Sequence, residues 1–392
     1  MRSLLKLVCL LPLGFGLSAA TSDKIFFPPS TGPWHVGKAQ HVLNHTTTND
    51  LFLPSNHNIS RFIVLTVLYP TKQAPTESTS LKYIDDKLAQ SLEDTWNFTS
   101  GSLQKLWTPL QWQPPPEDTT VLPTLLFSPG LDVSCDLSMV MTAEMASYGY
   151  TVLCIDHPGE PPYLKIPFSN KGVPGFAINY DWDDDALPRI NEIRKADFDA
   201  AIAAWPALVK KYKAPFNTTH FIHYGMSLGG SIGEYLVSAY QNVLGGVNYD
   251  GTFFDGPFGP GTVDVKKPFL LFHDDYHEGN DTTWTDFESA QTGWWADFRV
   301  NGTQHLDFMD TKWWIELTHQ KDPSKPVRGT VSGANPHTGT IKAIRCRKVQ
   351  SAFTRAFFDF VLGKGAGILN EPQPSPSWPE VVLYNSSKPS TS

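Results

Sequence analysis

Ser227 lies between Gly225 and Gly229 in the sequence Gly-Met-Ser-Leu-Gly, at the end of an apolar run that begins at His220. A serine hydroxyl becomes a nucleophile when a neighbouring base takes its proton. The Gly-x-Ser-x-Gly pattern holds such a serine on a sharp turn between a strand and a helix, where a Cβ on either flanking residue would meet adjoining backbone. The segment that follows, through Tyr240, is helix-like. This context favours a nucleophile elbow over an ordinary Gly/Ser loop.

The base that activates the serine is expected late in the chain. In α/β-hydrolases the order is serine, acid, histidine. His305 fits best, because it lies in a glycine-containing loop after the last predicted strand, while His277, His319 and His337 are its competitors.

Two positions are open for the carboxylate that orients the histidine. Asp250 ends the predicted strand directly after the nucleophile, whereas Asp274 and Asp275 end the following strand. The pattern of residues alone does not choose between them. Two further histidines have structural interpretations: His223 is predicted to lie in the core, and His157 to brace a lid.

Backbone N–H groups are expected to stabilise the oxyanion that forms on an ester carbonyl. Leu228, directly after the serine, supplies one donor. A second is predicted at Leu131, in a glycine turn that follows the predicted strand 124–128.

The cysteines and histidines show no zinc-binding spacing, so neither a metal nor a cofactor is expected. Of the four cysteines, Cys9 falls in a cleavable leader and Cys154 in a buried strand. The remaining two, Cys135 and Cys346, are predicted to form a disulfide.

The elements around these residues alternate. Strands are expected near 61–70, 124–131, 150–155, 220–226, 243–250, 268–275 and 298–300, and helices near 81–92, 140–148, 193–212, 228–240 and 349–362. Alternation of this kind predicts an α/β fold with a mostly parallel central sheet and helices on both faces, the α/β-hydrolase fold. The strand at 61–70 is expected on an antiparallel leading edge.

The sequence predicts one folded domain at 21–370, preceded by a secretory signal at 1–20 and followed by a disordered Pro/Ser-rich tail at 371–392. A long aromatic loop at about 160–188 is interpreted as a lid-like insertion. Substrate contacts are expected from Pro129, Met226, Phe253, Trp182 and Trp294.

Composition limits the partners. The net charge of −8 and pI near 5.8 argue against nucleic acid. A lipid or small-molecule ester, transient contact with lipid surfaces and no obligate protein partner are expected. Glycosylation sequons begin at seven asparagines and, with the leader, predict an extracellular glycoprotein: Asn44, Asn58, Asn97, Asn217, Asn280, Asn301 and Asn385.

Six segments in order resemble the secreted, plasma-type platelet-activating factor acetylhydrolase family, and especially its fungal members. These are RFIVLTVLYPT from Arg61, FSPGL from Phe127 with MASYGYTVLCIDHP from Met145, GMSLGG from Gly225, GGVNYDG from Gly245, residues 267–273, and GTQHLDFMD from Gly302.

This resemblance implies that Asp250 is the acid and that Leu131 and Leu228 are the oxyanion donors. It also implies a metal-independent serine esterase that removes short or oxidised sn-2 acyl groups from phospholipids. The chain departs from the family at Met226 and Pro129, where histidine is frequent, and both positions line the site. The alternatives are a broad short-chain carboxylesterase, a polyester or cutin-type hydrolase, and an inactive hydrolase-fold binding protein.

Overall fold

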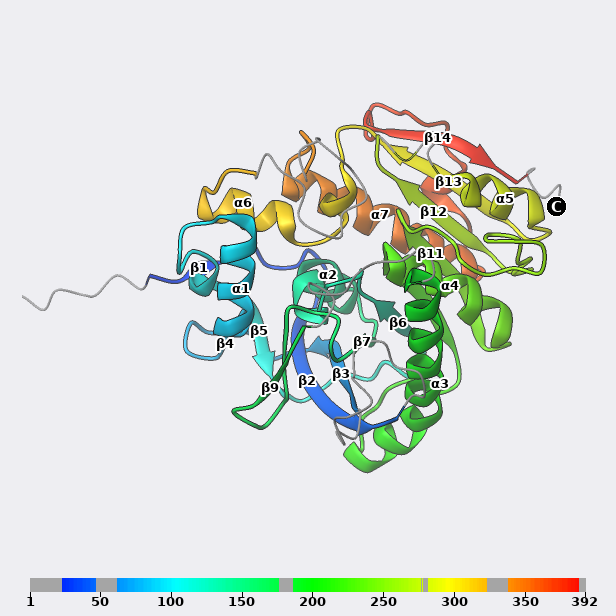
Figure 1. The fold of residues 1–392 in the computed structure, drawn as a ribbon. Helices are drawn as coiled ribbons and strands as arrows, with labels where there is room; N and C mark the ends of the chain where they lie inside the picture. The colour runs from blue at the N-terminus through cyan, green and yellow to red at the C-terminus, as the bar shows by residue number, and fades with distance from the viewer. Residues whose placement is uncertain are drawn as a thin grey trace, which may run out of the picture.

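The computed structural model describes residues 23–46, 62–175, 186–275, 277, 281–322 and 338–387. Its centre is a twelve-stranded sheet in the order β1-β5-β2-β3-β7-β6-β10-β11-β12-β13-β14, with β4 beside β5 (Figure 1). The strands of the chain are β1 (Ile25–Phe26), β2 (His35–Asn44), β3 (Phe62–Thr71), β4 (Ser80–Lys82), β5 (Leu106–Trp112), β6 (Thr124–Ser128), β7 (Val152–Asp156), β8 (Tyr163–Lys165), β9 (Gly172–Pro174), β10 (Phe221–Met226), β11 (Val243–Tyr249), β12 (Phe269–His273), β13 (Trp295–Val300) and β14 (Val381–Ser386).

The six strands from β7 to β13 are parallel, so their carboxyl ends meet at one edge of the sheet. Helices cover both faces. The α-helices are α1 (Asp86–Trp96), α2 (Met139–Ser147), α3 (Ala186–Tyr212), α4 (Leu228–Ala239), α5 (Thr282–Ala290), α6 (Thr311–Thr318) and α7 (Ala343–Val361).

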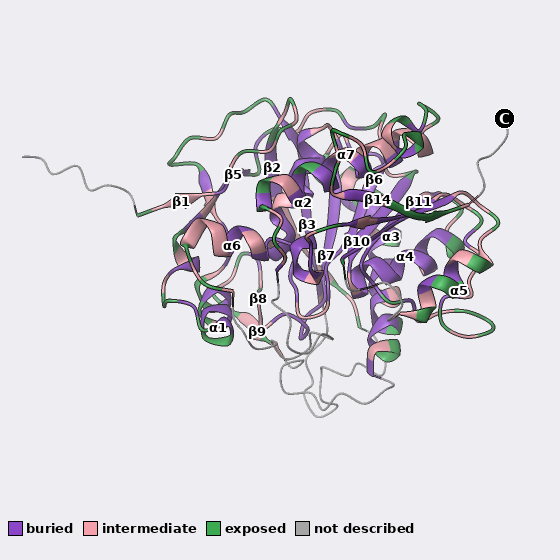
Figure 2. Ribbon diagram, turned by 90° about the horizontal axis from the view of Figure 1, so that it is seen from above, coloured by how far each residue is buried: buried purple, intermediate pink, exposed green. Residues whose placement is uncertain are grey.

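Successive strand residues point to opposite faces and so feed two separate cores. Leu125 and Phe127 of β6 pack with the cluster that contains α2 and α7, whereas Leu126 packs with the cluster that contains α3, α4 and α5. Figure 2 shows the buried strands enclosed between these helical layers. Because both faces are covered, the central strands read as continuous apolar runs, as is typical of parallel sheets.

The predicted α/β architecture with a mostly parallel sheet is confirmed. Most predicted elements occur within a few residues of their expected bounds, and α3 contains Pro206 as expected but starts earlier, at Ala186. The strand β3 pairs antiparallel with both β2 and β7. It is not at the edge of the sheet, however, because β2, β5 and β1 continue beyond it.

Two predictions about irregular segments are wrong. The stretch before residue 61, for which no strand was predicted, contains the ten-residue strand β2. The tail expected to be disordered from residue 371 contains β14, which pairs antiparallel with β13 and buries Val381. The lid-like insertion contains the hairpin β8–β9, and its residues 176–185 lie outside the described ones, as does the predicted leader. In the described part of the chain, none of the helices has the length and apolar character needed to cross a membrane.

Candidate active site

Ser227 occupies the turn between β10 and α4 with φ 55° and ψ −132°. A non-glycine residue at positive φ is strained by about 1–3 kcal/mol, which indicates that the surrounding structure holds it there. The neighbouring glycines are required. A Cβ on Gly225 would lie 2.2 Å from the Gly229 carbonyl oxygen, and one on Gly229 would lie 2.0 Å from the Ser128 carbonyl oxygen. The turn therefore has the geometry expected of a nucleophile elbow.

The ends of β10 and β11 are joined next to the serine. The Ser227 N–H donates to the Tyr249 carbonyl at 2.7 Å, and a Cβ on Gly251 would lie 2.1 Å from the Ser227 carbonyl oxygen. Asp250 lies between Tyr249 and Gly251, with φ 60°. The serine and this aspartate are thus neighbours across the carboxyl edge of the sheet.

His305 contacts Asp250 directly. It begins a single turn of 3-10 helix, His305–Phe308, after β13, and its Nδ1 forms a short hydrogen bond with Asp250 Oδ2. The turn is fixed by a reciprocal cap, in which Gln304 and Asp307 each bind the other's backbone. The His305 side chain is 34% exposed and Asp250 is buried. Asp250 therefore holds the Nδ1 side of the His305 imidazole, while part of the ring stays exposed at the site.

A second histidine shares the same carboxylate. His277 Nδ1 lies 2.9 Å from Asp250 Oδ1, and the Asp274 N–H donates to that oxygen at 3.3 Å. Burial alone would raise the pKa of Asp250, but the charges and hydrogen bonds of His277 and His305 outweigh it and hold the pKa well below its usual range. For His277, burial opposes the carboxylates of Asp250, Asp281 and Asp274, and these raise its pKa. Asp250 is therefore a carboxylate at neutral pH.

The other candidate acids have different partners. Asp274 Oδ1 accepts the backbone N–H of His277 at 2.9 Å, and Asp275 Oδ2 accepts that of Gly302 at 2.7 Å. Both bonds shape the loops around Asp250. Among the competing histidines, His319 caps the carboxyl end of α6, and His337 lies outside the described residues.

The two histidines with structural interpretations, His223 and His157, lie in the interior. Burial lowers the pKa of His223 to about 3, so this side chain is a neutral core group, as expected. His157 Nδ1 lies 2.6 Å from Asp197 Oδ2 on α3.

The two predicted oxyanion donors flank the serine. Leu228 is the first residue of α4, where backbone N–H groups have no partner within the helix. Leu131 follows Gly130, whose Cβ, if present, would lie 3.4 Å from the Ser227 Cβ and 2.9 Å from the Met226 sulfur. The turn 128–131 therefore lies against the nucleophile.

A small apolar cluster lies beside these donors. Leu228 and Ile190 form its buried part, and Leu131, Leu187 and Phe254 pack against it half-buried. Phe254 and the start of α3 were not predicted as site residues. Their signal was weak, since α3 was expected to begin only at residue 193.

Two of the predicted substrate contacts are wrong. Phe253 is fully buried and stacks on Phe287 with ring centroids 4.3 Å apart. Trp294 precedes β13 and packs on Phe360 of α7, so it lies at the amino ends of the strands, opposite the serine. Met226 and Pro129 are buried next to the serine turn, so their contact with substrate stays a prediction, and Trp182 lies outside the described residues.

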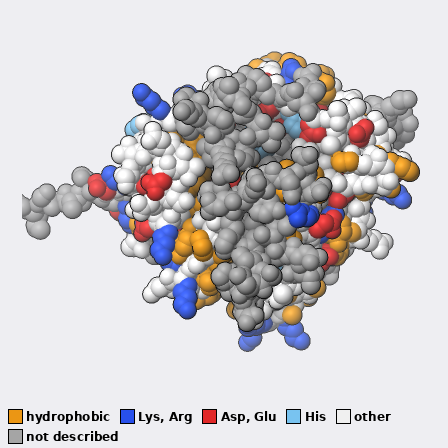
Figure 3. Space-filling model, viewed as in Figure 1, with side chains coloured by type: hydrophobic (Ala, Val, Ile, Leu, Met, Phe, Trp, Pro, Cys, Tyr) orange, Lys and Arg blue, Asp and Glu red, His pale blue; other side chains and the backbone are white. Residues whose placement is uncertain are grey.

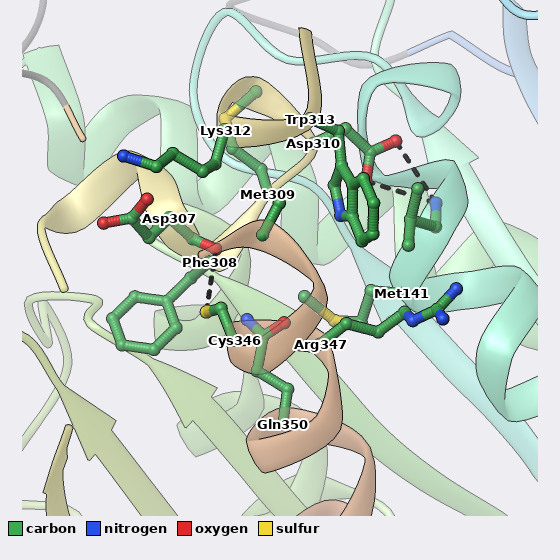
Figure 4. A pocket seen from close by; sticks show the side chains of 12 residues that line it. Met141, Asp307, Phe308, Met309, Asp310, Lys312, Trp313, Cys346, Arg347 and Gln350 are labelled. Atoms are coloured by element: carbon green, nitrogen blue, oxygen red, sulfur yellow. Dashed lines mark hydrogen bonds between the residues drawn. The ribbon is translucent and has the colours of Figure 1, made fainter. Parts of the chain in front are cut away.

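The predicted disulfide is also wrong. Cys135 pairs with Cys154, and their Cα atoms are 6.0 Å apart. Cys154 lies in β7. Cys135 begins a short 3-10 turn, Cys135–Ser138, which follows the glycine turn after β6 and lies beside β7. Cys346 of α7 is a buried free thiol that contacts the Asp307 carbonyl oxygen at 3.4 Å (Figure 4).

One of the seven sequons lies in an unsuitable place. Asn217 is buried, its amide nitrogen donates to the Thr120 carbonyl at 2.8 Å, and its oxygen accepts from Thr219 and His220. Such an amide is not available for a glycan in the folded protein. Asn44, Asn97, Asn301 and Asn385 are exposed, and Asn58 and Asn280 lie outside the described residues.

The described surface in Figure 3 carries lysine, arginine and acidic side chains in mixed order. Within the described ranges, no three His, Cys, Asp or Glu residues are grouped so that they could hold a metal ion.

Three comparisons with known proteins concern the family and the fold. The family model described as platelet-activating factor acetylhydrolase, isoform II, matches residues 19–165, a range that includes the turn 128–131 and ends before the serine. A protein of Arthroderma benhamiae named probable 1-alkyl-2-acetylglycerophosphocholine esterase is 25% identical over 280 residues, which are 68% of this chain and 67% of the relative. A ferulic acid esterase from Streptomyces cinnamoneus superposes with a TM-score of 0.72 at 21% identity, covering 92% of this chain and 99% of that structure.

The fold defines the class of architecture: the chain has the α/β-hydrolase fold, as expected. Its predicted kinship is confirmed. The chain resembles the platelet-activating factor acetylhydrolase family, whose model matches residues 19–165, and the fungal relative carries the name of an esterase.

Proposed function

We propose that this protein is a serine esterase in which Ser227, His305 and Asp250 form the catalytic triad, and that it removes short or oxidised sn-2 acyl groups from phospholipids. The observation that carries the proposal is the contact of His305 with a buried Asp250 whose backbone adjoins that of Ser227. A fixed carboxylate holds the imidazole in one tautomer and stabilises the imidazolium that forms during reaction.

In the acylation step, His305 Nε2 takes the proton of the Ser227 hydroxyl while its oxygen attacks the ester carbonyl carbon. The carbonyl oxygen becomes an oxyanion that accepts hydrogen bonds from the Leu131 and Leu228 N–H groups. As the tetrahedral intermediate collapses, the alcohol leaves with the proton from His305 and the acyl group remains on Ser227.

Water completes the cycle. His305 takes a proton from the water molecule as its oxygen attacks the acyl carbon. When the tetrahedral intermediate collapses, the bond to Ser227 Oγ breaks, His305 returns the proton to that oxygen, and the carboxylic acid is released. Asp250 stays ionised throughout, because its two histidines keep its pKa low.

The substrate class rests on two supports. The relative named as a 1-alkyl-2-acetylglycerophosphocholine esterase indicates an sn-2 acetyl ester of a phospholipid. The apolar cluster of Leu131, Leu228 and Phe254 beside the donors suits a small acyl group. A broad short-chain carboxylesterase is the second candidate, because that same cluster also fits simple esters.

We also propose that the protein is secreted and that some of its exposed sequons are glycosylated. Disulfides persist mainly in oxidising compartments, and the Cys135–Cys154 bond suits an extracellular protein. The predicted leader at 1–20 supports the same location.

Hydrolysis rates across an acyl series test the substrate. The series runs from acetyl to long-chain esters and includes an sn-2 acetyl phospholipid, with Ser227→Ala as the blank. The proposal predicts a Ser227-dependent rate that is highest for the sn-2 acetyl phospholipid. Activity confined to simple short esters would favour the broad carboxylesterase, and equal rates in the blank would contradict the proposed triad.

A further inference from the structure

A buried arginine holds the back of the turn that carries the Leu131 donor. Arg194, on α3, is completely buried, and its Nη1 donates to the Pro129 carbonyl at 2.6 Å while its Nη2 donates to the Gly130 carbonyl at 2.9 Å. Nη1 also lies 3.3 Å from the Ser128 hydroxyl oxygen. One guanidinium group therefore binds three consecutive residues of the turn.

A buried carboxylate balances the positive charge of Arg194. Glu160, equally buried, accepts from Arg194 through both carboxylate oxygens, with Nε to Oε1 at 3.2 Å and Nη2 to Oε2 at 2.5 Å. Glu160 itself belongs to the loop after β7, where its N–H donates to the His157 carbonyl. A buried ion pair of this kind is tolerated when further hydrogen bonds satisfy both partners. Here the remaining arginine donors are used on the turn.

The direction of these bonds determines where the turn's N–H groups point. In a trans peptide the C=O and N–H bonds are antiparallel. Because the Gly130 carbonyl points toward Arg194, the Leu131 N–H points the opposite way. The Pro129 carbonyl orients the Gly130 N–H in the same manner. A Cβ on Gly130 would lie 3.4 Å from the Ser227 Cβ, so the nucleophile adjoins this turn.

We propose that Arg194 is a positioning residue of the oxyanion hole, which fixes the Leu131 N–H for the transition state by binding the carbonyls behind it. This inference rests on the proposed function of Ser227. It assigns the Arg194–Glu160 pair a role in the rate of the chemical step, in addition to its packing between α3 and the sheet.

Lysine cannot replace this arginine. The planar guanidinium places several donors in a fixed fork, whereas an ammonium group is a single point charge. Arg194→Lys keeps the charge that pairs with Glu160 but cannot bind both carbonyls and the carboxylate together. The turn would then relax, and the Leu131 N–H would lose its fixed direction.

The test compares a carbonyl ester with the matching thionoester, in which sulfur replaces the carbonyl oxygen. An oxygen anion depends strongly on precise N–H donors, while the larger and weakly accepting sulfur profits little from them. Arg194→Lys is expected to lower kcat for the carbonyl ester about 100-fold, the usual cost of one lost oxyanion donor. The thionoester rate is expected to fall less than tenfold, with KM for both esters little changed.

A matched control is available on α7. Arg345 also binds a carboxylate and a backbone carbonyl, those of Glu380 and Ser377, away from the serine. Arg345→Lys is expected to leave the ratio of the two rates at its wild-type value. Merely partial unfolding of Arg194→Lys would lower both rates equally and would also leave the ratio unchanged.

If Arg194→Lys does not fold, the double variant Arg194→Met with Glu160→Gln, which removes both buried charges, is measured in its place. The ratio of the carbonyl-ester rate to the thionoester rate is again expected to fall. An unchanged ratio in the folded variant would overturn the role of Arg194. Failure of the proposed function appears differently, as wild-type hydrolysis that persists in Ser227→Ala.

Discussion

At the scale of single residues, the arrangement around Asp250 determines what the site can do. One carboxylate is buried between His305 and His277, and its pKa is held low by both. His305 belongs to the loop that follows the last parallel strand, and its side chain is 34% exposed, compared with 11% for that of His277. The two imidazoles therefore have different roles: His305 is the proposed base, and His277 neutralises and orients the carboxylate from behind.

Asp250→Asn is expected to lower kcat about 10,000-fold, because the histidine loses its correct tautomer and its counter-charge. Asp274→Asn is the matched control, since Asp274 follows the neighbouring strand β12 and its Oδ1 accepts the backbone N–H of His277. We expect it to change kcat less than tenfold. Steady-state kinetics on a short-chain ester measures both. A large loss in Asp274→Asn with little loss in Asp250→Asn would mean that the acid is wrongly assigned.

Much of this site could be predicted from the residues, but not all of it. The spacing around Ser227 and the order of strands pointed to the elbow and to His305. The choice of Asp250 over Asp274 needed a resemblance to a family, because both end parallel strands. The contact of His277 with Asp250 and the hydrogen bonds from Arg194 to the turn 128–131 could not be predicted from the sequence. Each depends on loops and helices that meet only in the folded chain.

At the scale of elements, the disulfide and the last strand show where sequence patterns were insufficient. An apolar strand such as β7 predicts that Cys154 is buried, but burial does not exclude a disulfide. Likewise, a Pro/Ser-rich composition predicted disorder after residue 371, yet a short apolar stretch within it adds β14 to the exposed edge of β13. An edge strand gains its stability from its neighbour, and single-sequence patterns do not reveal that partner.

Removing the disulfide with Cys154→Ser and Cys135→Ser together is expected to lower the free energy of unfolding by about 3 kcal/mol, the value typical of a closed loop of this length. Cys346→Ser serves as the control, because it keeps a donor for the Asp307 carbonyl, and is expected to cost no more than about 1 kcal/mol. Urea unfolding measures both. Peptide mapping without reduction should recover Cys135 joined to Cys154; recovery of Cys346 in a disulfide would contradict the structure.

The position of β14 is tested by Val381→Ala. Val381 is fully buried, so its truncation is expected to destabilise the fold by about 1–2 kcal/mol. Leu383→Ala, two residues along the same strand but exposed, should change stability by less than about 0.5 kcal/mol. Thermal unfolding distinguishes the two variants. Equal and negligible effects would show that the tail does not pack as a strand.

At the scale of the whole molecule, the fold buries several carboxyl groups in addition to that of Asp250. Burial raises the pKa of Asp156 and of Asp307 to about 7, and that of Asp310 and of Glu234 to about 8. Asp310, labelled in Figure 4, shows the pattern: it accepts hydrogen bonds from the Val140 N–H at the start of α2 and from the Tyr83 hydroxyl. These groups link global stability to pH.

Stability is expected to fall between pH 6.5 and pH 8.5. A carboxyl group with a raised folded pKa binds a proton in the folded chain that the unfolded chain has already lost, so its contribution disappears as pH rises toward the folded value. Each group contributes up to about 1.4 kcal/mol per pH unit. The buried His223 and His273, with pKa values lowered to about 3 and about 4, act in the opposite direction, but only below about pH 6.5.

Melting temperatures at several pH values measure this dependence, with Asp310→Asn as the informative variant. Asn keeps an oxygen for Val140 and Tyr83 but does not ionise, so the variant should lose less stability than wild type as pH rises from 6.5 to 8.5. A wild-type stability that increases over this interval would contradict the assignment of protonated buried carboxyls.

The central claim is that Ser227 carries the acyl group during turnover. The most direct measurement is acid quenching during hydrolysis of p-nitrophenyl acetate, followed by mass spectrometry of the peptides. We expect an acetyl group on the peptide that contains Ser227 and a burst of p-nitrophenol of about one per protein molecule, and we expect neither in Ser227→Ala. Turnover that persists in Ser227→Ala, or an acetyl group on another residue that turns over at the catalytic rate, would contradict it.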